Sequence, residues 1–80
     1  MITKKFIVDN FKGVENLIEI DNGFKFDCNY NEVKIEKSIN GNILICTHEF
    51  STREGDSVEV YSENEVLEYF SNRDSSRFLK

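Results

Sequence analysis

Two Asn-Gly pairs, at residues 22–23 and 40–41, each lie between segments in which apolar and polar residues alternate. Alternation with a period of two is typical of strands that cover a core with one face, and Asn and Gly tolerate the positive φ that a tight hairpin requires. The sequence therefore predicts two antiparallel hairpins in the middle of the chain.

The positions of the apolar residues predict a register for the first hairpin. A three-residue loop at residues 21–23 pairs Ile20 with Phe24 and Ile18 with Phe26. These four apolar side chains then share one face of the sheet.

The second hairpin has a register of its own. A loop of residues 39–41, with its glycine as a bulge, pairs Ile35 with Ile45 and Val33 with Thr47. A two-residue loop would instead set apolar residues against Ser38 and Glu36. The pattern favours the longer loop.

Further elements are expected on both sides of the hairpins. Alternation favours strands at residues 5–9, 16–20 and 57–61. Ser62 and Glu65 form a capping box, in which each side chain bonds the backbone amide of the other residue, and this box predicts a helix from about residue 63 to 72. The expected apolar stripe of this helix is Val66, Leu67 and Phe70, with Tyr69 at its border. Residues 73–80 are expected to continue the helix loosely, since two large apolar residues near the end of the chain would otherwise be exposed.

Residues 43–46 (Ile-Leu-Ile-Cys) are apolar at both parities, a pattern typical of a central strand that is covered on both faces. The C-terminal helix can cover one face. Curvature of the sheet, partial closure into a barrel or a second subunit would have to cover the other. A homodimer would use the second face of this strand, with Leu44, His48 and Phe50.

The length of 80 residues allows one domain, residues 1–80, with one thin core. An apolar fraction of 39% with 31% charged residues is ordinary for a globular protein. The expected fold is α+β: a strongly bent antiparallel meander of five or six strands with one C-terminal helix. No apolar run is long enough for a membrane span or a signal peptide, so the expected compartment is the cytoplasm.

Catalytic chemistry finds little support in these residues. His48 and Glu49 project to opposite faces of a strand, so their adjacency does not make a catalytic pair. Cys28, Cys46 and His48 lack the close spacing of zinc ligands, and the two cysteines are expected to be buried thiols. The isolated glycines form no phosphate-binding loop. We expect no enzyme activity, no catalytic residue, no metal and no cofactor.

Residues 49–68 hold seven carboxylates and one base, Arg53, which gives this segment a charge of −6 in a chain of net charge −5. Glu63, Glu65 and Glu68 are explained by the start of a helix, where anions are favoured. Four acids remain on a predicted hairpin and its loop, where crowded like charges cost stability. The candidate partner-binding residues are therefore Glu49, Glu54, Asp56 and Glu59.

These acids favour a small non-enzymatic protein that binds a basic protein surface. The sharpest version is an inhibitor that occupies the nucleic-acid-binding cleft of an enzyme, as small acidic phage-encoded inhibitors of restriction and CRISPR systems do, an analogy of size and charge alone. The first alternative is the homo-oligomer described above. The second is a small barrel that stacks single-stranded nucleic acid on aromatic strands, although the net negative charge opposes direct nucleic-acid binding.

Overall fold

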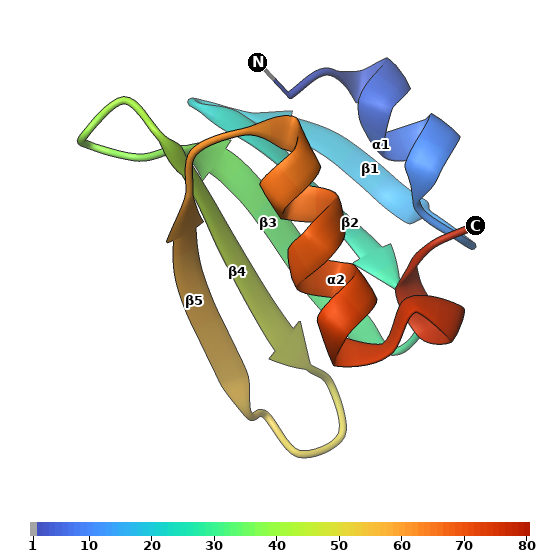
Figure 1. Cartoon of the computed structure of the whole chain (residues 1–80). Helices are drawn as coiled ribbons and strands as arrows, with labels where there is room; N and C mark the ends of the chain where they lie inside the picture. The colour runs from blue at the N-terminus through green and yellow to red at the C-terminus, as the bar shows by residue number, and fades with distance from the viewer. Residues whose placement is uncertain (1) are drawn as a thin grey trace.

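The computed structural model describes residues 2–80, and the side chains of all of these except residues 74–76. Five antiparallel strands form one open sheet in the order β1-β2-β3-β4-β5, with a helix at each end of the chain (Figure 1). The α+β expectation is confirmed, whereas the sheet is not closed into a barrel. The elements are α1 (Lys4–Asn10), β1 (Glu15–Ile20), β2 (Gly23–Cys28), β3 (Asn31–Lys37), β4 (Ile43–Glu49), β5 (Gly55–Val60) and α2 (Glu63–Phe78).

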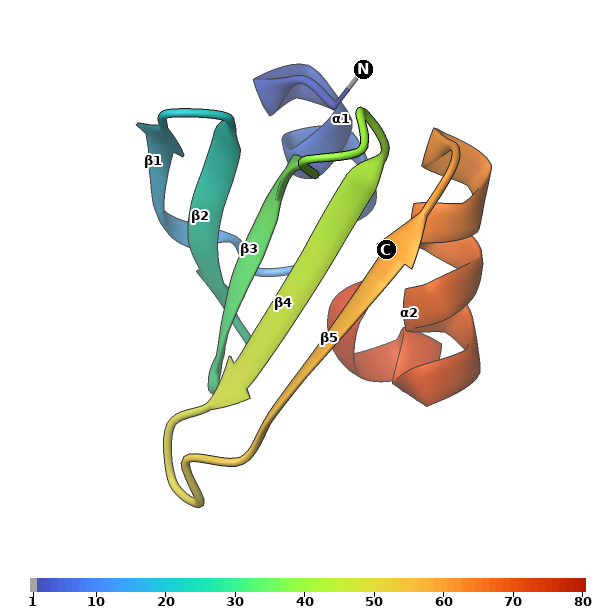
Figure 2. The ribbon, with the colours of Figure 1, turned by 90° about the vertical axis from the view of Figure 1, so that its left-hand side faces the viewer.

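One apolar core lies between the sheet and the two helices. Ile7 of α1 and Val66 and Phe70 of α2 are fully buried against alternate residues of β2 to β5. The ring of Phe11 packs edge-on against those of Phe26 and Phe70, with centroids 5.1 and 5.0 Å away. Both helices therefore cover the same face of the sheet, and the strand twist carries the opposite face away from them (Figure 2).

The strand predicted at residues 5–9 is wrong, because this segment is part of α1. The Thr3 hydroxyl caps the helix by accepting a hydrogen bond from the Phe6 amide at 3.1 Å. Ile7 and Phe11, four residues apart, then reach the core together. The apolar run Phe6-Ile7-Val8 resembles a strand, but the cap and the four-residue spacing decide for a helix.

The predicted register of the first hairpin is wrong by one residue. Ile20 pairs with Gly23 across a two-residue loop, and Ile18 therefore lies opposite Lys25. A bulge between Glu15 and Ile18 turns Leu17 toward the core in its place. Ile18 is left 48% exposed on the opposite face.

The second hairpin has the predicted register. Ile35 pairs with Ile45 and Val33 with Thr47, and the Ser38 amide donates to the Asn42 carbonyl at 2.8 Å to close the loop of residues 39–41. The predicted coverage of residues 43–46 on both faces is wrong, however. β3 is the central strand, Ile45 faces the core, and Leu44 and Cys46 are half-buried on the face that neither helix covers.

The C-terminal helix begins as predicted and runs six residues further, from Glu63 to Phe78. Ser62 accepts from the Glu65 amide at 3.2 Å, while the Glu65 carboxylate accepts from the amide of Tyr61 at 3.1 Å instead of that of Ser62. Phe78 is buried in the core. Neither helix in the described part of the chain is long and apolar enough to span a membrane.

The two ends of the chain meet beside α1. Leu79 forms an isolated antiparallel bridge with Phe11. The Lys12 amide donates to the Phe78 carbonyl at 2.8 Å, and the Lys80 amide donates to the Asn10 carbonyl at 3.0 Å. The last residues thus complete the core instead of forming a loose tail.

Candidate functional site: an acidic hollow between the β4–β5 hairpin and α2

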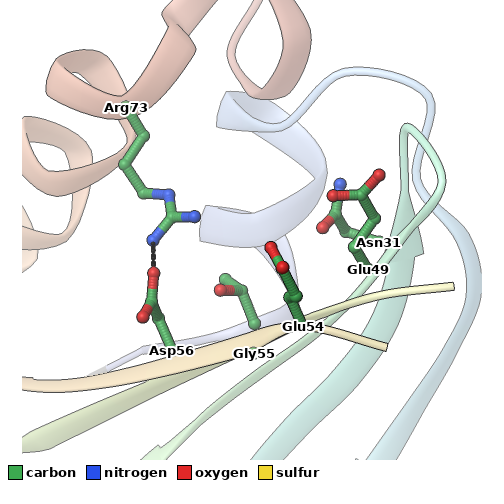
Figure 3. Close-up of a pocket in the computed structure, with 7 residues that line it drawn as sticks. Asn31, Glu49, Glu54, Gly55, Asp56 and Arg73 are labelled. Atoms are coloured by element: carbon green, nitrogen blue, oxygen red, sulfur yellow. Dashed lines mark hydrogen bonds and ion pairs between the residues drawn. The ribbon is translucent and has the colours of Figure 1, made fainter. Parts of the chain in front are cut away.

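The structure divides the four candidate acids between two places. Glu49, Glu54 and Asp56 surround a hollow of about 440 Å³ between the β4–β5 hairpin and α2, which we call the acidic hollow. Glu59 lies near the other end of β5 and points to the uncovered face, as its neighbours Val58 and Val60 turn toward the core. The acidic hollow is lined by Asn31, Thr47, Glu49, Glu54, Gly55, Asp56 and Arg73 (Figure 3).

Backbone hydrogen bonds fix the hairpin that carries two of these carboxylates. The Glu49 amide donates to the Glu54 carbonyl at 2.8 Å, and the Arg53 amide donates to the Glu49 carbonyl at 2.9 Å. Arg53 has a left-handed φ of 61°, which reverses the chain direction. The Ser51 hydroxyl donates to Glu49 Oε1 at 3.1 Å. Both carboxylates are therefore held at the mouth of the hollow by a short, hydrogen-bonded loop.

Two buried polar residues form the floor of the acidic hollow. Asn31 is 8% exposed and Thr47 is 5% exposed. Asn31 is the register partner of Glu49, and its Nδ2 donates to the Asn29 carbonyl at 3.0 Å. The floor thus continues the core face of β3 and β4 with polar groups in place of apolar ones.

Arg73 supplies the positive charge of the acidic hollow. It reaches from α2 to donate to Asp56 Oδ2 at 2.5 Å and to the Tyr69 hydroxyl at 2.6 Å (Figure 3). The hydrogen bond to Asp56 raises the pKa of the Arg73 guanidinium. The sequence analysis missed Arg73, although its spacing of four residues from Tyr69 on a predicted helix was a usable signal.

The carboxylates of the hollow differ in their partners. Asp56 is paired with Arg73, and Glu49 accepts from a hydroxyl group. The described interactions give the Glu54 carboxylate no ion pair, and its side chain points into the space beneath α2 (Figure 3). Three acids against one base leave an excess of negative charge, which suits a guanidinium or ammonium group from another molecule.

Glu59 has a structural role instead. Its carboxylate accepts from Asn42 Nδ2 at 2.7 Å and from the Ser38 hydroxyl at 3.0 Å, with a longer contact from Asn40 Nδ2 at 3.4 Å. These hydrogen bonds lower the pKa of the Glu59 carboxyl group. Glu59 therefore ties the β3–β4 loop to β5 and is separate from the acidic hollow.

The other residues considered from the sequence lie apart from one another. Leu44 and His48 are on the uncovered face, and Phe50 follows the end of β4, 49% exposed. Cys28 is buried on the core face, whereas Cys46 faces the opposite way. Among the described residues, no group of His, Cys, Asp and Glu side chains could hold a metal ion.

The aromatic residues considered for base stacking face inward. Phe26 is fully buried and Phe24 packs against the core, so their rings are not presented for stacking. Comparison of the chain with protein-family models, with curated proteins and with solved structures gave no match. The function of the chain is therefore inferred from its own residues.

Proposed function

We propose that this protein is a small non-enzymatic binding protein that acts by contact with a basic surface of a partner protein. The observation that carries the proposal is the acidic hollow, in which three carboxylates converge and one, Asp56, has a basic partner. An arginine or lysine side chain of the partner enters the hollow between Glu49 and Glu54.

The shape of the β4–β5 hairpin supports this role. It projects beyond the ends of the other elements (Figures 1 and 2), and residues 51–57 are all exposed. An arginine offers five N–H donors in a planar fork, which suits two carboxylates at the mouth and amide and hydroxyl groups at the floor. A hydrogen-bonded loop that already holds the carboxylates in place reduces the entropy lost on binding.

The finer form of the proposal is that the basic surface belongs to a nucleic-acid-handling enzyme. Such enzymes present clusters of lysine and arginine to phosphates, and a protein of net charge −5 is steered to these clusters while being repelled by nucleic acid itself. Binding there competes with the nucleic acid. The protein then acts as an inhibitor by occupying the cleft.

A matched pair of double variants tests the hollow. Glu49→Gln with Glu54→Gln removes the two carboxylates at the mouth, and Glu19→Gln with Glu68→Gln removes two exposed acids elsewhere, so both pairs change the net charge from −5 to −3. A partner is isolated by affinity capture from the native host after nuclease treatment, and its affinity is measured at several salt concentrations. We expect the first pair to weaken binding at least tenfold, about 1.4 kcal/mol, and the second pair to change it less than threefold.

Salt dependence provides the second readout. Binding through the hollow weakens as salt concentration rises, because exposed charges are screened. Equal losses from the two double variants, or binding that salt leaves unchanged, would contradict the proposal. The finer form fails separately if the captured partner binds this protein and its nucleic acid at the same time.

A second candidate is a homo-oligomer that uses the uncovered face of the sheet. Ile18 of β1 is 48% exposed on this face, and Leu44 of β4 lies half-buried on the same face. A symmetric dimer would cover both residues. Light scattering of the purified protein tests this candidate, and a strict monomer at high concentration removes it.

A further inference from the structure

The loop between β3 and β4 presents one fully exposed isoleucine on a fixed support. The Ser38 hydroxyl oxygen accepts from the amides of Asn40 at 3.2 Å and Asn42 at 3.0 Å, and Glu59 accepts from the side chains around it. The Ile39 side chain is entirely exposed at the tip of this loop. We call residues 38–42 the Ile39 tip.

This arrangement serves no evident purpose within the chain itself. A fully exposed Ile39 adds nothing to the core, and its branched side chain is poorly suited to a turn. The hydrogen bonds nevertheless fix the backbone around it. An apolar side chain held in this way is prepared for insertion into another surface, because little conformational entropy remains to be lost.

The opposite end of β3 and β4 carries a hollow of about 510 Å³, partly lined by aromatic rings. Tyr30 is 77% exposed and Phe50 is 49% exposed, and the Phe50 amide donates to the Tyr30 carbonyl at 3.0 Å. Gly13, Cys28 and Arg77 are among the other lining residues. We call this site the aromatic hollow.

The backbone at Tyr30 indicates that its exposed ring has a role. Asn29 and Tyr30 both adopt left-handed φ values, 49° and 65°. This conformation is unusual for a bulky residue and is favoured by glycine. The fold therefore bears a backbone cost to hold a tyrosine at a position where its ring stays mostly outside the core.

We propose that the Ile39 tip of one copy inserts into the aromatic hollow of a second copy. The two sites lie at opposite ends of the same pair of strands, so each copy offers one tip and one hollow (Figure 1). Such a head-to-tail contact is heterologous and joins copies in a row or a ring. It is independent of the acidic hollow and of the function proposed above.

Complementation between two variants tests the contact. Ile39→Ser removes the tip, and Tyr30→Gly removes one ring of the aromatic hollow while suiting the left-handed backbone, so that variant is expected to remain folded. Wild-type protein is diluted from roughly 1 mM, a range that suits a contact this small, and amide NMR shifts are followed. We expect the shifts of residues 38–42 and of the aromatic hollow to change together with concentration, and to stay constant in either variant alone.

The mixed sample gives the decisive result. When labelled Ile39→Ser protein is titrated with unlabelled Tyr30→Gly protein, its aromatic-hollow signals should move while its own residues 38–42 remain still. Ile18→Ser, which removes an exposed isoleucine from the uncovered face, should leave the association unchanged. Concentration-independent shifts in the wild type, no response in the mixture, or loss of association in Ile18→Ser would each overturn the proposal.

Discussion

Replacement of Gly23 by alanine tests why a glycine is needed at the start of β2. A Cβ atom there would overlap the Ile35 carbonyl oxygen and lie 2.6 Å from the Glu36 Cα atom. Normal contact requires β3 to move by about 1 Å. That movement opens the strand end where the Lys37 amide donates to the Asn22 carbonyl at 2.8 Å, and it loosens the packing of Phe24.

Two or three hydrogen bonds at about 1 kcal/mol each, with part of the burial of a phenylalanine, predict a loss of about 3 kcal/mol in the free energy of unfolding. The total for a domain of 80 residues is roughly 4 to 12 kcal/mol, so this loss is large. Urea denaturation followed by far-ultraviolet circular dichroism measures it, provided that the slope with denaturant is unchanged.

Asparagine distinguishes this explanation from a requirement for positive φ. If Gly23 were needed for left-handed backbone, Gly23→Asn would be well tolerated. The close approach of β3 predicts instead that Gly23→Asn and Gly23→Ala are equally damaging. Gly41 is the control, because its φ is +84° and no atom lies within 4 Å of an added Cβ, so Gly41→Asn should cost less than about 1 kcal/mol. A mild Gly23→Asn variant would refute the reasoning.

Three further predictions concern the core and two titratable groups. Phe70→Ala should lower the free energy of unfolding by about 3 to 5 kcal/mol in denaturant titrations, because its buried ring contacts those of Phe11 and Phe78. Burial raises the pKa of the Cys28 thiol, so the unfolded chain loses this proton at lower pH than the folded chain, and stability should fall as the pH rises above about 8.5; Cys28→Val should lack this decline. Hydrogen bonds lower the pKa of Glu59, so its contribution should be lost as the pH falls below about 4.5, and thermal melts of Glu59→Gln should be less sensitive to pH in that range.

The sequence predicted those parts of the fold that local patterns determine. The loop of residues 39–41 fits only one register, because any other pairs apolar residues with polar ones, and the structure has that register. The helix start at Ser62 was readable from its cap. The first hairpin was misread because the bulge before Ile18 changes the parity of β1, and no local pattern indicates a bulge.

The candidate site was predicted only in part, because it depends on contacts between distant elements. Glu49, Glu54 and Asp56 are close in sequence and could be grouped by charge alone. Arg73 joins them only because α2 folds back over the hairpin, as its hydrogen bond to Asp56 shows. The separation of Glu59 depends in turn on the β3–β4 loop, whose polar side chains accommodate its carboxylate.

The bridge between Phe11 and Leu79 sets an order in which the molecule can assemble. The five strands pair only with their sequence neighbours, so each hairpin can form as soon as its second strand has left the ribosome. The segment after α1 has no such neighbour and waits for the last residues of the chain. Closing so long a loop is slow, and α1 should therefore dock late in folding and be the first element to detach on unfolding.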